Sequence, residues 1–238
     1  MNTFLRSFPL LLALGYPTLL TWVYFDLLAE SEAGVQQTVY GLGKCLQFAF
    51  PLAWYLLVQK QSLRLRGSAR ASVLAGLAFG GAAAVATGML FHFVLAPAGL
   101  FAGGPQEAIR AKVTGFGIRH AGQYAALAVF YSLIHALLEE YYWRWFVFGQ
   151  LRRTWRPWSA ITVSSLAFAG HHVVVLAQFF GGLSAATIFF TLCVACGGAF
   201  WAWLYDRDRS LVAPWLSHML VDAGIFAVGY SLVREVLQ

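Results

Sequence analysis

A group of ionisable residues lies inside a long apolar stretch, from about residue 121 to residue 148. It reads His135-Ala-Leu-Leu-Glu139-Glu140-Tyr-Tyr-Trp-Arg144. Two carboxylates and a guanidinium in a lipid-soluble segment cost several kcal/mol unless they meet partners, so they indicate a functional site. Glu140 and Arg144 are four residues apart and can neutralise each other on a helix. Glu139 points about 100° away and needs another partner, and His135 lies one turn before it on the same face.

Two later apolar stretches carry further ionisable residues, His171 and His172 in one and His218 and Asp222 in the other. His218 and Asp222 are four apart, so they face the same way and the carboxylate can fix the imidazole tautomer. His171 and His172 are neighbours and cannot both face one cavity. We place His172 in the site and give His171 a supporting or packing position.

The depths of these residues predict that they meet. At 1.5 Å per residue, Glu139 lies about 18 Å, His172 about 22 Å and His218 about 12 Å from the expected inner ends of their helices. The alternative is that these residues form polar pairs that only hold helices together. Such pairs need fewer ionisable groups than this chain has. We therefore expect one site shared by three helices.

A carboxylate beside a histidine, within a wall of apolar helices, is suited to activating a water molecule. A second histidine that donates a hydrogen bond can stabilise the oxyanion formed when water attacks a carbonyl. These residues therefore point to hydrolysis of a peptide bond at or within a membrane. Zinc is the nearest rival, since His172, His218 and Glu139 would form an open site with water as the fourth ligand. Because no His-Glu-x-x-His helix is present, we expect no metal and no other cofactor.

Composition places the chain in a membrane. Of its 238 residues, 60% are hydrophobic and only 11% are charged, against roughly 25% charged in an average soluble domain. The net charge of +6 comes from residues in short loops between apolar runs, so we expect a lipid bilayer and no nucleic acid as partner. Three cysteines, Cys45, Cys193 and Cys196, fall within apolar runs, so we expect neither a disulfide framework nor a zinc ribbon. We interpret Cys193 and Cys196 as small residues for helix packing.

Apolar runs predict an all-α, polytopic transmembrane bundle of about seven helices. A partial eighth element has room between residues 97 and 120, where Pro105 to Val113 is expected to form a short interfacial helix. We treat residues 1–238 as a single integral membrane domain with a motif-bearing core at about 121–232. The expected spans are 8–28, 39–58, 71–95, 121–151, 157–180, 183–205 and 211–232.

Basic residues in the loops predict the orientation. With the N-terminus inside, ten Lys and Arg residues fall on the inner side and four on the outer side, which favours N-in topology. Lys44, about 8 Å into its expected helix, is interpreted as reaching back to the interface. Gly76, Gly80 and Ala84 are spaced four apart, a pattern typical of close helix packing.

Three motifs, taken in order, resemble those of the CPBP intramembrane proteases. This family includes the type II CAAX prenyl endopeptidases and bacteriocin-processing relatives. Its pattern is Glu-Glu-x-x-x-Arg, then Phe-x-x-x-His, then His-x-x-x-Asn or Asp. Here the motifs read Glu139-Glu140-Tyr-Tyr-Trp-Arg144, Phe168-Ala-Gly-His-His172 and His218-Met-Leu-Val-Asp222, between about residues 130 and 225.

The resemblance implies a role for each matched position. Glu139 would activate water with His172 beside it, and Glu140 with Arg144 would shape the site. His218 and Asp222 would form the side that stabilises the oxyanion. This chain has Asp222 where the prenyl endopeptidases typically carry Asn, and an ionised Asp cannot donate a hydrogen bond, so Asp222 would be protonated or act through His218.

The substrate implied is a peptide or protein at the membrane. A prenylated CAAX-like C-terminus, a leader peptide and a C-terminal sorting signal all fit equally well. The rival classes are a zinc-dependent membrane protease, a proton-coupled transporter and a non-enzymatic immunity scaffold. Short loops and the absence of added targeting segments favour a prokaryotic inner membrane.

Overall fold

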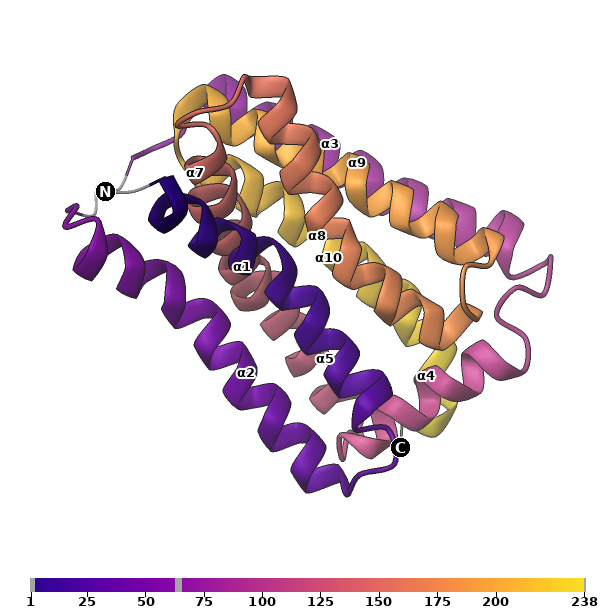
Figure 1. Ribbon diagram of the computed structural model, residues 1–238. Coiled ribbons are helices and arrows are strands. Elements are labelled where there is room, and N and C mark those ends of the chain that lie inside the picture. The colour runs from indigo at the N-terminus through magenta and orange to yellow at the C-terminus, as the bar shows by residue number, and fades with distance from the viewer. Residues whose placement is uncertain (1–2, 63–65, 238) are drawn as a thin grey trace. The chain divides into compact units, whose positions relative to one another are not determined.

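A computed structural model describes residues 3–62 and 66–237 of the chain. All of the regular secondary structure in these residues is helical (Figure 1), which confirms the predicted fold class. Arg64, one of the basic residues counted above, lies outside the described residues. The longer helices are α1 (Thr3–Trp22), α2 (Ala33–Ala53), α3 (Arg70–Leu90), α4 (Gly104–Gly115), α5 (Ala121–Val129), α8 (Pro157–Phe180), α9 (Ala185–Asp208) and α10 (Val212–Val233).

Shorter helical segments continue several of these elements. Most of them have π-helical hydrogen bonding. This pattern is rare in proteins, and where it occurs it is frequently at a functional site. From Ala121 to Leu151, the segments follow one another without a break and form one long apolar span. The shorter segments are η1 (Val23–Leu27), η2 (Trp54–Val58), η3 (Phe91–Leu95), η4 (Phe130–His135), α6 (Ala136–Glu140), η5 (Tyr141–Phe148), α7 (Gly149–Leu151) and the 3₁₀ turn η6 (Arg234–Val236).

Seven helical stretches in the described residues are long and apolar enough to cross a membrane, which confirms the predicted number. The largest difference is at the second span, which begins at Ala33 instead of residue 39. Helix α4 has proline in its first turn and ends at Gly115, close to the predicted bounds. The inward orientation of the N-terminus stays a prediction.

Large apolar side chains on the outer surfaces of the spans agree with a lipid environment. Leu57, Phe93 and Trp158 are each more than 70% exposed. The three cysteines are also exposed and free, so the interpretation of Cys193 and Cys196 as packing residues was wrong. A soluble protein rarely leaves so much apolar surface uncovered.

Contacts along the chain define two units, which we describe separately. Unit 1 comprises Met1–Gly67 and Glu139–Leu211, and unit 2 comprises Ser68–Leu138 and Val212–Gln238. The long span therefore contributes to both units, with the division between Leu138 and Glu139. The single domain expected from the sequence stays a prediction.

In unit 1, α8 packs against α1 and α9, and η5 packs against α8. The side chains of η5 are the centre of this packing, because Trp143, Phe146 and Phe148 are each at most 1% exposed. Tyr142 adds a hydrogen bond from its hydroxyl to the Ala13 carbonyl of α1, at 2.7 Å. These contacts fix the helix face that follows Glu139 and Glu140.

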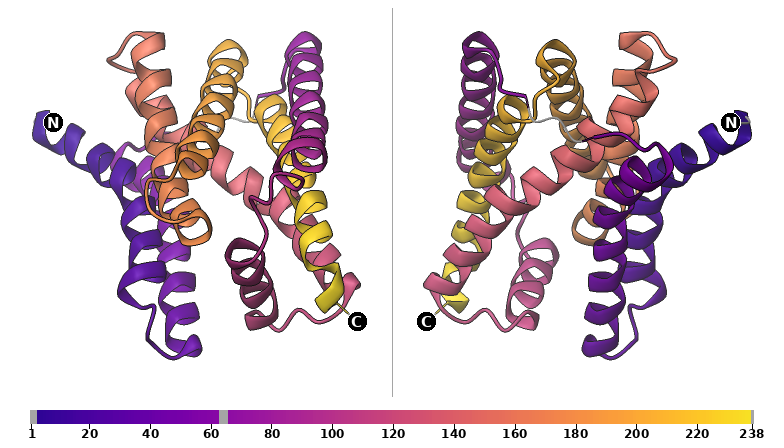
Figure 2. Two further views of the ribbon diagram at one scale, coloured as in Figure 1. Left: turned by 90° about the vertical axis from the view of Figure 1, so that its right-hand side faces the viewer. Right: turned by 90° about the vertical axis from the view of Figure 1, so that its left-hand side faces the viewer.

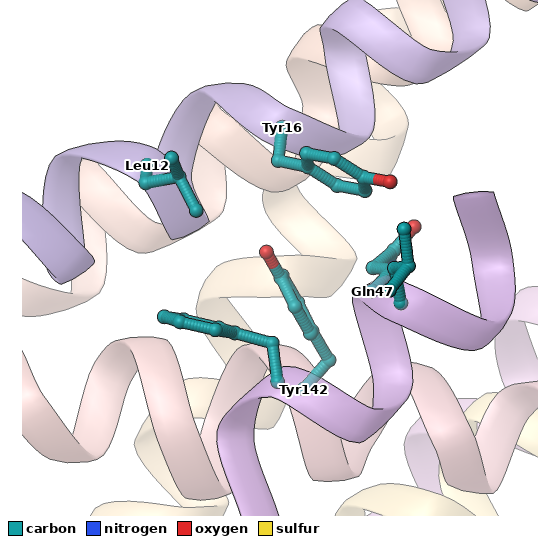
Figure 3. Close-up of a pocket in the computed structure, with 6 residues that line it drawn as sticks. Leu12, Tyr16, Gln47 and Tyr142 are labelled. Atoms are coloured by element: carbon teal, nitrogen blue, oxygen red, sulfur yellow. The ribbon is translucent and has the colours of Figure 1, made fainter. Parts of the chain in front are cut away.

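A small cavity lies among α1, α2 and η5 of unit 1 (Figure 3). Its volume is about 140 Å³, and its walls are mostly apolar. The Tyr16 hydroxyl donates to the Gly43 carbonyl at 3.0 Å, whereas Gln47 Oε1 is buried with no hydrogen-bond partner among the described residues. The lining residues are Leu12, Tyr16, Leu46, Gln47, Phe50 and Tyr142.

In unit 2, α3 and α10 lie side by side (Figure 2). A Cβ added at Gly80 would be 2.5 Å from the Ser217 carbonyl oxygen, and one added at Gly224 would be 2.7 Å from Ala84 Cα. Only small residues permit helix backbones to approach this closely. The close packing predicted for Gly80 and Ala84 is therefore confirmed, and it holds the part of α10 that carries His218. Gly76 is buried on the same helix.

Candidate active site

Glu140 and Arg144 form the ion pair expected from their spacing in unit 1. Arg144 Nη1 lies 3.2 Å from Glu140 Oε1, and the two side chains are 2% and 0% exposed. Arg144 Nη2 also donates to the Gly198 carbonyl of α9 at 3.2 Å. The guanidinium lies over the rings of Phe168 and Trp201, at 4.5 and 5.1 Å from their centroids. Such a pair is costly to break, because the surviving partner would be a buried, uncompensated charge.

Phe168 is the aromatic centre of this arrangement. It is 1% exposed, and its ring contacts Trp143, His171 and His172 as well as Trp201. Gly198 of α9 lies against it, because a Cβ added at Gly198 would be 3.1 Å from the Phe168 ring. Phe168 therefore separates the Arg144 ion pair from the two histidines while contacting both.

Glu139 is buried in the same unit and meets an imidazole. Its Oε1 lies 3.4 Å from His171 Nε2, and both side chains are less than 8% exposed. The His171 ring is stacked on the Trp143 ring, with 4° between their planes. In the neutral tautomer with the proton on Nε2, this nitrogen donates to the carboxylate.

His172 has a different environment. Its side chain is half-buried, and its Nδ1 lies 3.1 Å from the Phe168 carbonyl oxygen. A carbonyl only accepts, so this hydrogen bond requires the proton on Nδ1 and makes Nε2 the basic nitrogen of the neutral ring. In this tautomer Nε2 is the nitrogen that accepts hydrogen bonds.

From the sequence we placed His172 beside Glu139 and gave His171 a supporting or packing position. The structure brings His171 into contact with Glu139, because α8 is rotated so that the His171 ring stacks on Trp143 of η5. This contact agrees with a supporting position for His171. The place of His172 beside Glu139 and its catalytic role stay predictions.

Unit 2 contains the other ionisable residues of the predicted site. His218 Nε2 lies 3.5 Å from Asp222 Oδ1 on α10, and the His218 side chain is 5% exposed. His135 is half-buried near the end of η4, with its ring 4.9 Å from that of Tyr131. The expected pairing of His218 with Asp222 is present, and its role in stabilising an oxyanion stays a prediction.

Lys44 of α2 lies in the same unit and is not part of the three motifs. Its ammonium lies 5.4 Å from the Tyr40 ring centroid and 5.7 Å from that of Phe48. From the sequence we placed it about 8 Å into its helix. Because α2 begins at Ala33, Lys44 is 11 residues after the first residue and so about 16 Å along the helix.

Metal binding was the alternative for the same residues. Within each unit, the described residues contain no group of three or more His, Cys, Asp or Glu side chains placed to hold a metal ion. A zinc site built from His172, His218 and Glu139 would draw ligands from both units. The absence of a cofactor therefore stays a prediction, to be tested by chelation.

Comparison with protein families supports the resemblance seen in the motifs. The family model described as type II CAAX prenyl endopeptidase Rce1-like matches residues 121–224. This segment includes all three motifs, so the suspected resemblance is confirmed. No curated protein and no solved structure matches the chain. Together, the match and the seven apolar spans identify a multi-pass membrane protein similar to a family of proteases.

Proposed function

We propose, from the match of residues 121–224 to the Rce1-like family, that this protein is an intramembrane endopeptidase. The observation that carries the proposal is the burial of Glu139 against an imidazole in an apolar span. A carboxylate of this kind has little water around it, so a water molecule admitted with the substrate meets a strong and well-placed acceptor.

The chemistry uses one water molecule and the residues of the three motifs. Glu139 accepts a proton from water as the water oxygen attacks the scissile carbonyl carbon. His172, with its proton on Nδ1, offers Nε2 to orient the same water. The tetrahedral oxyanion then collapses and breaks the C–N bond, and Glu139 returns the proton to the leaving amine.

Stabilisation of the oxyanion is assigned to His218. A hydrogen bond from an imidazole to the developing negative charge lowers the barrier, because the charge exists only after attack. Asp222, 3.5 Å from His218 Nε2, favours a protonated imidazole that can donate. With this assignment, Asp222 can act through His218 at the position where the prenyl endopeptidases typically carry asparagine.

The buried pair of Glu140 and Arg144 is assigned a shaping role. It lies directly after Glu139 in sequence and links the helix to Gly198 of α9. This link fixes the rotation of the long span and so the direction in which Glu139 points. The substrate is proposed to be a prenylated CAAX-like C-terminus, a leader peptide or a C-terminal sorting signal, in a prokaryotic inner membrane.

Reporter cleavage by the purified protein in liposomes tests the proposal. Three reporters, one for each substrate class, are incubated with wild type and with Glu139→Gln. We expect wild type to cleave at least one reporter, with no loss of rate after treatment with a chelator. Failure of wild type to cleave any reporter contradicts the proposal, and loss on chelation with recovery on added zinc supports the metal alternative instead.

A further inference from the structure

The charged residues of unit 1 include one, Lys44, that is not part of the three motifs. Away from the ends of its described spans, the unit carries two carboxylates and two cations: Glu139, Glu140, Lys44 and Arg144. Arg144 is already committed to Glu140 by the 3.2 Å ion pair. Lys44 and Glu139 are the other cation and carboxylate of this set, and Glu139 also lies 3.4 Å from His171 Nε2.

Lys44 lies near the middle of its helical stretch. Helix α2 begins at Ala33, and the stretch continues through η2 to Val58. At 1.5 Å per residue, Lys44 is about 16 Å from the first end and about 21 Å from the second. Both distances exceed the length of a lysine side chain, so a charge at this position gains from a nearby charge of opposite sign.

The surroundings of Lys44 suit a held cation. Tyr40 and Phe48 lie one helical turn before and after it, and the ammonium is 5.4 and 5.7 Å from their ring centroids. Phe48 is itself fixed to η5, because the Tyr141 hydroxyl donates to the Phe48 carbonyl at 3.3 Å. The same α2 face that holds the ammonium is thus attached to the residues that follow Glu139.

We infer that Lys44 is the counter-charge of Glu139 and positions its carboxylate as Arg144 positions that of Glu140. The lysine is a positioning residue, because the α2 face that holds its ammonium is joined to η5, the segment that follows Glu139 and Glu140. Burying two unpaired charges of opposite sign would cost far more than burying them near each other. Its consequence for activity rests on the proposed function, whereas its consequence for folding does not.

A double-mutant cycle on thermal unfolding in detergent tests the pairing without any activity assay. The variants are Lys44→Met, Glu139→Gln and the double variant, with Lys60→Met in the same cycle as the control. We expect the double variant to lose less in midpoint temperature than the sum of the two single losses. The inference is overturned if the loss in midpoint temperature of the double variant equals the sum of the two single losses. It is also overturned if Lys60→Met, at an exposed position, couples to Glu139→Gln as strongly as Lys44→Met does. If Lys44→Met alone does not insert, recovery of folding in the double variant supports the pairing and failure to recover contradicts it.

Activity provides a second and separate readout. Lys44→Arg keeps the positive charge and is expected to retain kcat close to wild type, whereas Lys44→Met loses roughly 10- to 100-fold in kcat with little change in KM. Equal losses in both variants, or a change confined to KM, contradict a positioning role. If wild type cleaves no reporter, the proposed function fails while the unfolding cycle still decides whether Lys44 and Glu139 interact.

Discussion

Unit 1 and unit 2 hold their ionisable side chains in different ways. In unit 1, Glu140 and Arg144 are fully buried, paired with each other and covered by aromatic rings. In unit 2, His218 and Asp222 lie on a helix that is held by close backbone approach at Gly80 and Gly224. Stability should therefore depend on charge balance in the first unit and on side-chain volume in the second.

The difference also suits the chemistry assigned to each unit. A base must keep its carboxylate in one direction throughout the reaction, and a network of charges and rings does this. A donor to an oxyanion must lie on a rigid scaffold, which tightly packed helices provide. Variants in each unit test whether the two units differ in this way.

The largest expected effects are on catalysis by the histidines. His172→Ala should lower kcat by roughly 100- to 10,000-fold, because the attacking water loses the imidazole that orients it towards the scissile carbonyl. His218→Ala should lower kcat by roughly 100- to 1,000-fold as the loss of an oxyanion donor. His171→Ala should cost about tenfold, because it only loosens Glu139. Rates of reporter cleavage in liposomes measure all three. A His171→Ala loss larger than that of His172→Ala would exchange the two roles.

Removal of the buried guanidinium tests charge balance in unit 1. Arg144→Met leaves the Glu140 carboxylate buried without its counter-charge, so we expect a loss of about 3–5 kcal/mol in the free energy of unfolding. The double variant with Glu140→Gln should recover most of this loss. Chemical unfolding in detergent measures both, and the exposed Arg156→Met serves as the control. If Arg144→Met and Arg156→Met were equally stable, the ion pair would not carry the packing of unit 1.

A single methyl group tests the packing of unit 2. Gly80→Ala places a Cβ 2.5 Å from the Ser217 carbonyl oxygen, so α3 and α10 must separate at a cost of about 1–3 kcal/mol. The neighbouring Gly81→Ala is the matched control, because nothing lies within 4 Å of its added Cβ. The difference in unfolding free energy between the two variants measures the effect. Equal stability would show that close approach of the helices is not required.

The smallest expected effect is at the cavity of unit 1. Gln47→Leu removes a buried acceptor that has no hydrogen-bond partner among the described residues, and should stabilise the protein by about 1 kcal/mol. Gln37→Leu, at an exposed position on the same helix, should change stability little. Midpoint temperatures of the two variants give the comparison. A loss of stability in Gln47→Leu would show that the amide is satisfied in the membrane.

Much of the architecture follows from hydrophobicity alone. The apolar runs predict all seven spans, and Pro105 with Glu107 predicts α4, because these signals are local. The same is true of the pair formed by Glu140 and Arg144, since spacing of four on a helix decides it. These features need no knowledge of neighbouring helices.

Features that depend on neighbouring helices were harder to predict. The contact of His171 with Glu139 could not be predicted from the sequence, because His171 and His172 both lie in an apolar run and the rotation of α8 decides where each ring points. The start of α2 was missed because its first turns are polar. Gln36 there donates to the carbonyls of Tyr24 and Leu28, at 2.9 and 3.3 Å, so a polar residue that suggested a loop serves to join two helices.

The central claim is that Glu139 activates the attacking water, and the most direct test is the single-turnover cleavage rate of Glu139→Gln. The amide has nearly the same shape as the carboxylate but is not a base. We predict that cleavage falls to the background rate while the variant still inserts and unfolds cooperatively in detergent. Cleavage at a rate close to wild type by a folded Glu139→Gln protein would contradict the account.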